Sequence, residues 1–195
     1  MTMNLWNEKK FEVGDEEPER DFRNKIVIIY PHEFKEMADD VRATLSSKNI
    51  PDFGQITDEL FEKIFVVLTY ALNEKEQTRR LKDFEVISLR VYQKERHKNI
   101  DRMLGRPDAF FKYEMYLVGE KWDKLTKEQK IQAVIHELLH LNPDKPDQFK
   151  KHDRFDREYE LMEKYLEAKN EKVTTKEAMV ITARLKKKKL LMEEV

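Results

Sequence analysis

The chain has no cysteine in its 195 residues. Disulfide bridges and thiolate metal ligands are therefore excluded, and the reducing cytoplasm is the compartment that we expect. Apolar and charged residues each make up 39% of the chain, a mixture typical of a globular protein with a densely charged surface. The length suits one domain with a sizeable buried core.

Long apolar runs and an excess of either charge are also missing. The longest apolar run, residues 64–72 (IFVVLTYAL), is too short to cross a bilayer. The first twenty residues lack the apolar stretch of a signal peptide. Because the formal net charge is −1, global electrostatics favour neither a nucleic-acid nor a membrane partner. We expect no membrane association, and nucleic-acid binding would need a local basic patch.

The charge pattern divides the chain into three parts. Residues 1–24 are polar and highly charged, and we predict a loosely ordered or sheet-edge extension there. Residues 25–168 carry the apolar periodicity of one domain, whose core we place at residues 83–166. Residues 169–195, with the basic run Arg184–Lys189, are predicted to form a basic helical tail.

Apolar spacing, turn residues and helix caps predict an α+β domain that is mostly helical, with a small sheet just before the helix at residues 127–141. Pro31 fits the first turn of a helix, and Thr126 with Gln129 forms a capping box. The predicted strands cover residues 25–31, 83–92 and 109–118. The predicted helices cover residues 31–46, 58–73, 127–141 and 146–168.

The most informative stretch is residues 131–141, IQAVIHELLHL. Burying an unpartnered carboxylate costs several kcal/mol, so Glu137 between two histidines in an apolar run requires a reason. On a helix, His136 and His140 project from the same side, one turn apart. Zinc prefers neutral imidazole nitrogens in a tetrahedral shell, and a catalytic zinc keeps one position open for water. We therefore predict that His136 and His140 are zinc ligands.

Glu137 is predicted to be the catalytic base. It lies at the border of the histidine face, where its carboxylate can reach a water molecule bound to the ion. Zinc lowers the pKa of such a water from about 16 to about 7, so that a neighbouring carboxylate can take its proton. The competing interpretation is a buried helix with two hydrogen-bonded core histidines and Glu137 on a solvated flank. The apolar stripe beside the motif favours the metal site.

Two histidines are too few for a catalytic zinc, which usually has three protein ligands. His152 follows His140 by twelve residues and falls on the apolar stripe of the next predicted helix, so it is the first candidate. Glu160, twenty residues after His140, is the second, although helical geometry places it about 80° off that stripe. Asp156 fits better as an acceptor that orients the His152 ring.

Residues 113–160 resemble metallopeptidases found in phage, bacterial and archaeal genomes. The shared features are a strand, a W-x-x-L stretch, a helix with HELLH, and a following HD with an aromatic residue just after it. More distantly, the chain is similar to SprT-like zinc proteases, although Asp153 replaces the glycine of their HGxxF motif. The resemblance covers about residues 83–166. It implies a minimal zincin-like fold with His136, His140 and His152 as ligands and Glu137 as base.

The resemblance also implies a place for the substrate. In zincins of this layout, the strand before the active-site helix often pairs with an extended peptide. Residues 112–118 (KYEMYLV) would be that strand here, and their main-chain groups would bind a peptide by strand addition. The alternative is an ordinary strand inside the sheet.

Together these observations predict a zinc-dependent metallopeptidase that acts on a peptide or protein substrate. The alternative is a non-catalytic metal-binding regulatory or DNA-associated protein, which would contact phosphates through the basic residues of the segment 94–102 and the tail run at 184–189. A purely structural helical domain is the third hypothesis. It predicts that no metal survives dialysis.

Overall fold

The computed structural model describes residues 8–13, 22–48, 50–92, 111–145, 148, 150 and 155–169. A five-stranded sheet has the order β1-β2-β3-β5-β4. Its strands are β1 (Lys9–Val13), β2 (Lys25–Ile29), β3 (Ile64–Ala71), β4 (Ile87–Val91) and β5 (Tyr113–Val118). The helices are α1 (His32–Ser47), α2 (Pro51–Gly54), α3 (Asp58–Glu62), α4 (Glu74–Asp83), α6 (Gly119–Trp122), α7 (Lys127–Leu139) and α8 (Phe155–Ala168).

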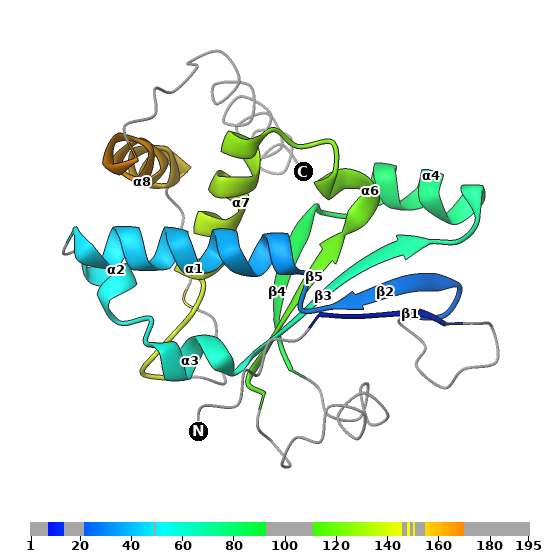
Figure 1. Ribbon diagram of the computed structural model, residues 1–195, viewed down its shortest axis with the longest axis horizontal. Coiled ribbons are helices and arrows are strands. Elements are labelled where there is room, and N and C mark those ends of the chain that lie inside the picture. The colour runs from blue at the N-terminus through cyan, green and yellow to red at the C-terminus, as the bar shows by residue number, and fades with distance from the viewer. Residues whose placement is uncertain are drawn as a thin grey trace, which may run out of the picture.

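The sheet is mixed. β3 and β5 run parallel, and the other neighbouring strands pair antiparallel. The long helices α1, α7 and α8 lie on one side of the sheet (Figure 1). This arrangement confirms the predicted α+β class. In the described part of the chain, none of the helices is both long and apolar enough to cross a membrane.

The predicted helix at residues 58–73 is wrong beyond its first turns. Thr57 does cap a helix by accepting a hydrogen bond from the main-chain N–H of Leu60, but this helix, α3, ends at Glu62. The apolar run that follows is β3, a central strand that is buried on both faces. Such strands show continuous apolar runs without alternation, so periodicity alone does not separate them from buried helices. The β-branched residues of this run favour a strand.

Other predicted elements are confirmed with shifted ends. α1 follows Pro31, and β4 occupies the second half of the predicted strand at residues 83–92. Both hydrogen bonds of the capping box at the start of α7 are present: the side chains of Thr126 and Gln129 each accept from the main-chain N–H of the other residue. The predicted helix at residues 146–168 is confirmed over Phe155–Ala168 as α8, whereas the described residues 148 and 150 are not helical.

The prediction that residues 112–118 are the substrate-binding edge is wrong. β5 pairs with β3 on one side and β4 on the other, so its main-chain groups are used within the sheet. It is the ordinary interior strand of the alternative prediction. β4 is the last strand in the sheet order, next to the helix that carries the HELLH motif.

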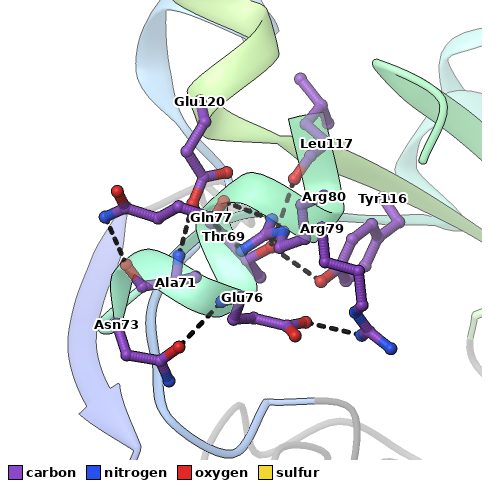
Figure 2. Close-up of polar contacts among 10 residues, drawn as sticks. All are labelled: Thr69, Ala71, Asn73, Glu76, Gln77, Arg79, Arg80, Tyr116, Leu117 and Glu120. Carbon is purple, nitrogen blue, oxygen red and sulfur yellow. Dashed lines mark hydrogen bonds and ion pairs between the residues drawn. The ribbon is translucent and has the colours of Figure 1, made fainter. Parts of the chain in front are cut away.

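A polar network holds α4 against the end of the sheet (Figure 2). The buried Arg80 donates from Nη2 to the carbonyl oxygen of Thr69 at 2.8 Å and to its Oγ1 at 2.7 Å. Its Nη1 lies 3.4 Å from Oε1 of Glu120 in α6. Thr69 Oγ1 in turn donates to the hydroxyl of Tyr116 at 2.7 Å. The network joins α4 to β3, β5 and α6, and β4 follows α4 after three residues.

Replacing Arg80 with alanine should destabilise the fold by about 3–5 kcal/mol, because it leaves the buried Thr69 and Glu120 groups without their charged partner. Urea unfolding of the purified variant measures this loss. Arg79→Ala is the matched control, since Arg79 pairs with Glu76 at the surface and should contribute about 1 kcal/mol or less. Equal losses in the two variants would contradict a structural role for the network.

A second polar contact ties α8 to α1. The Tyr165 hydroxyl donates to Oδ2 of Asp40 at 2.6 Å, and Lys169 Nζ lies 2.6 Å from Oδ1 of the same residue. Partial burial alone would raise the pKa of Asp40, but the hydrogen bonds from Lys169 and Tyr165 outweigh it and hold the pKa below its usual range. The contact fixes α8 along its C-terminal half.

Candidate metal and catalytic site

The orientation of α7 is set by its core face and by its C-terminal end. Its buried apolar residues are Ile131, Val134, Ile135, Leu138 and Leu139. Just past the helix, the Tyr113 hydroxyl of β5 accepts from the main-chain N–H of Asn142 at 3.3 Å and donates to the Asn142 carbonyl oxygen at 3.2 Å. α7 is therefore held rigidly above β5 and β4, with its histidine side only partly covered.

The two histidine rings converge. The Nε2 atoms of His136 and His140 lie 3.1 Å apart, and the ring planes are nearly perpendicular, at 84°. His136 lies within α7 and His140 caps its C-terminus. The spacing predicted from the sequence therefore brings the two candidate ligands together at one point.

Each ring is hydrogen bonded through its other nitrogen. Nδ1 of His136 lies 2.7 Å from Oε1 of Glu158 in α8, and Nδ1 of His140 lies 3.0 Å from the carbonyl oxygen of Lys150. A carbonyl or carboxylate oxygen accepts hydrogen bonds, so each Nδ1 carries the hydrogen. In a neutral ring, Nε2 then holds a lone pair. Two lone pairs that face each other at 3.1 Å repel unless a cation or a proton lies between them.

This geometry fits a bound zinc ion. Zinc–nitrogen bonds of 2.0–2.1 Å at a tetrahedral angle separate two ligand nitrogens by about 3.3 Å, close to the spacing observed. Metal-binding histidines usually donate their second N–H to a carboxylate or a main-chain carbonyl, and Glu158 and Lys150 supply one of each. Within the described residues, no three His, Asp or Glu side chains are grouped so as to hold a metal.

Of the candidates for the third ligand, the structure describes only the side chain of Glu160. His152 and the side chain of Asp156 lie outside the described residues. Glu160 is exposed, and its Oε1 lies 2.5 Å from Nζ of Lys164, whose hydrogen bond and charge lower the pKa of the carboxyl. The structure thus directs the Glu160 carboxylate to a surface lysine and does not group it with the two histidines.

Glu137 faces β4. It is buried, and its Oε2 accepts a hydrogen bond from the main-chain N–H of Leu89 at 2.9 Å. Burial raises the pKa of Glu137 to about 7, against the opposing effects of the nearby His136 and of the Leu89 hydrogen bond. A carboxylate that titrates near neutral pH is well suited to general base catalysis at that pH. The predicted base is therefore buried near His136, and its raised pKa suits this role.

The two histidines differ electrostatically. Burial lowers the pKa of His136, but the hydrogen bond and charge of Glu158 outweigh it and raise the pKa above its ordinary value. Burial likewise lowers the pKa of His140, and the hydrogen bond with Lys150 does not compensate. In the metal-free protein, a shared proton is therefore carried by His136 in preference to His140.

Glu158 and Leu89 are site residues that the sequence did not reveal. Glu158 occupies a core position of α8, because the buried residues of this helix follow the helical pattern Glu158, Leu161, Met162, Tyr165 and Leu166. A glutamate within an apolar stripe is the feature that could have identified it. Leu89 acts through its main-chain N–H. Every residue except proline has this group, so the sequence does not single out position 89.

Raising the pH should destabilise the metal-free wild type relative to Glu137→Gln. The ordinary pKa of the Glu137 carboxyl is 4.5 and its folded-state pKa is about 7. Between pH 4.5 and pH 7 the folded state binds this proton more tightly than the unfolded chain does. The contribution of the protonated carboxyl to the free energy of unfolding is therefore complete below pH 4.5 and is lost as the pH rises through 7. Urea unfolding with a chelator present, at several pH values, measures the difference. A pH-independent difference would contradict the raised pKa.

Comparison with known proteins identifies the family of the chain. A family described as "Putative phage metallopeptidase" matches residues 29–182, which is most of the chain and includes α7 and α8. Searches of the curated proteins and of the solved structures found no match. The chain belongs to this phage metallopeptidase family.

Proposed function

We propose that the protein is a zinc-dependent metallopeptidase that hydrolyses peptide bonds in a peptide or protein substrate. His136, His140 and His152 would be the metal ligands, and Glu137 the general base. One observation carries the proposal: the Nε2 atoms of His136 and His140 face each other at 3.1 Å while both Nδ1 atoms are hydrogen bonded to acceptors. This is the arrangement of two imidazoles prepared to share a cation.

Main-chain contacts of Lys150 support His152 as the third ligand. The Lys150 N–H donates to the carbonyl oxygen of His140 at 2.8 Å, and the Lys150 carbonyl accepts from Nδ1 of the same residue. Lys150 is thus held against His140 through both its N–H and its carbonyl group. His152 follows Lys150 by only two residues in the sequence, a length of chain that spans at most about 7 Å, and this short separation supports its choice as the third ligand.

The chain's own residues account for the proton transfers. Bound zinc would supply Lewis acidity to a water molecule and to the substrate carbonyl. Glu137, held through Oε2 by Leu89, would accept the proton of that water at its other oxygen and later donate it to the departing amine. In the metal-free protein burial raises the pKa of this carboxyl to about 7, and a bound cation nearby would lower it and so favour the ionised form that accepts the proton.

The outer side of β4 is where an extended substrate would lie. Val86 and Tyr92 use their main-chain groups toward β5. By the alternation of an antiparallel strand, Ile87, Leu89 and Val91 direct theirs away from β5. Glu137 already accepts from the Leu89 N–H on that side. A peptide added to this edge would therefore pass directly beside the catalytic carboxylate.

The alternative of a DNA-associated protein stays a prediction. Its basic segments, at residues 94–102 and 184–189, lie outside the described residues. Salt-dependent DNA binding, without cleavage of any peptide, would favour it over the peptidase.

The purified protein should hold about one zinc ion per chain, and Glu137→Gln should keep the metal but lose hydrolysis. The glutamine amide cannot take a proton, and loss of a general base typically lowers the rate by about 10²–10⁴-fold. Metal analysis and cleavage of a peptide library measure the two effects. Glu128→Gln, in the first turn of the same helix, is the control and should change neither. Undiminished hydrolysis in Glu137→Gln would rule out the proposed base.

The third ligand can be tested in the same way. His152→Ala should lower zinc affinity by orders of magnitude, because it leaves only two protein ligands. Glu160→Ala should leave the affinity unchanged, because that carboxylate pairs with Lys164. Competition titrations with a chromophoric chelator compare the two variants. The reverse result would make Glu160 the ligand.

A further inference from the structure

We propose that Glu158 is a positioning residue of the metal site, which holds the His136 ring in the tautomer and orientation that present Nε2 to the ion. The inference rests on the proposed metal site and extends it to a residue of α8. It also gives α8 a function, because this helix carries the acceptor that supports the His136 ring on the side away from the ion.

The first support is the contact itself. Glu158 Oε1 lies 2.7 Å from Nδ1 of His136, and the Glu158 side chain is only 2% exposed. A carboxylate removed from water costs several kcal/mol unless it is paired and hydrogen bonded. The contact with His136 supplies such a pairing for the charge at this core position, between the apolar stripe residues Leu161 and Met162 and the metal site.

The geometry favours a positioning role over direct ligation. Oε1 of Glu158 meets Nδ1 of His136, whereas Nε2 of the same ring points to His140. Nδ1 and Nε2 lie on opposite sides of the imidazole. A carboxylate bound to Nδ1 is separated by the ring from an ion placed between the two Nε2 atoms.

The two rings are supported by different acceptors. His140 is held by the Lys150 carbonyl, a neutral group on a neighbouring segment of the chain. His136 is held by a carboxylate, and hydrogen bonds to charged acceptors are roughly twice as strong as neutral ones. A carboxylate acceptor also makes the imidazole more basic, and hence a better metal ligand. Removing Glu158 should therefore affect His136 and leave the support of His140 in place.

The position of Glu158 is itself constrained. Tyr165, two turns further along α8, and Lys169, just past the end of this helix, both bond to Asp40 of α1. α1 packs in turn against α7, where Lys130 Nζ lies 2.6 Å from Oε1 of Glu33. The carboxylate is thus held by a helix that is fixed relative to its partner ring.

The test is zinc affinity in Glu158→Gln, measured by chelator competition on the full chain. The amide oxygen can still accept from Nδ1, but the charge is gone, and loss of such a partner typically weakens metal binding by about 10–100-fold. Glu167→Gln, an exposed glutamate on the same helix, is the matched control and should bind zinc like the wild type. Urea unfolding of both variants reports whether the fold is intact.

A second readout does not depend on zinc. Nitrogen-15 NMR of the histidine rings in the metal-free protein should show His136 protonated at Nδ1 in the wild type, with that preference lost in Glu158→Ala while His140 is unchanged. A purely structural role of Glu158 would not shift one tautomer selectively.

The outcomes separate this inference from the proposed function. If the wild type binds zinc and Glu158→Gln binds it equally well, the positioning role is overturned and the peptidase proposal stands. If Glu158→Gln loses zinc as completely as His136→Ala, Glu158 is a ligand and the positioning role is again overturned. If the wild type binds no zinc but the His136 tautomer changes as expected, the proposed function fails and the role of Glu158 in orienting the ring is retained.

Discussion

The central constraint of this structure is the contact between two imidazole nitrogens, which face each other at 3.1 Å. The hydrogen bond at Nδ1 of each ring leaves its Nε2 as an acceptor. Lone pairs at that distance repel, so the arrangement is stable only with a positive charge between them. A helical turn brings His136 and His140 together, but helix geometry alone does not choose which nitrogen faces inward. Glu158 and the Lys150 carbonyl make that choice, and the metal binding that we propose depends on it.

Separate elements of the fold supply the other groups around the two histidines. β5 anchors the end of α7 through Tyr113 and Asn142. β4 supplies the Leu89 N–H that holds Glu137, and the Arg80 network ties α4, the helix before β4, to β3. α8 supplies Glu158 and is fixed to α1 through Asp40. These contacts hold the proposed ligands His136 and His140, the proposed base and the strand edge beside which a peptide would lie.

Sequence patterns predicted the parts of this site that depend on local spacing. His136, His140 and Glu137 lie on one helix, and the Thr126 capping box determines where that helix begins, so helical geometry was sufficient. The failures come from long-range pairing. β3 was mistaken for a helix because a strand buried on both faces has no alternation. β5 was mistaken for an edge because strand order is a tertiary property. Glu158 was missed because its partner is twenty-two residues away in the sequence.

The most direct test of the central claim is the position of zinc in crystals of the zinc-loaded protein, located by anomalous diffraction at the zinc edge. The account predicts one strong peak between the two rings, about 2.0–2.1 Å from Nε2 of His136 and from Nε2 of His140. A peak bound to either Nδ1 atom, or no peak near this pair after zinc loading, would contradict it.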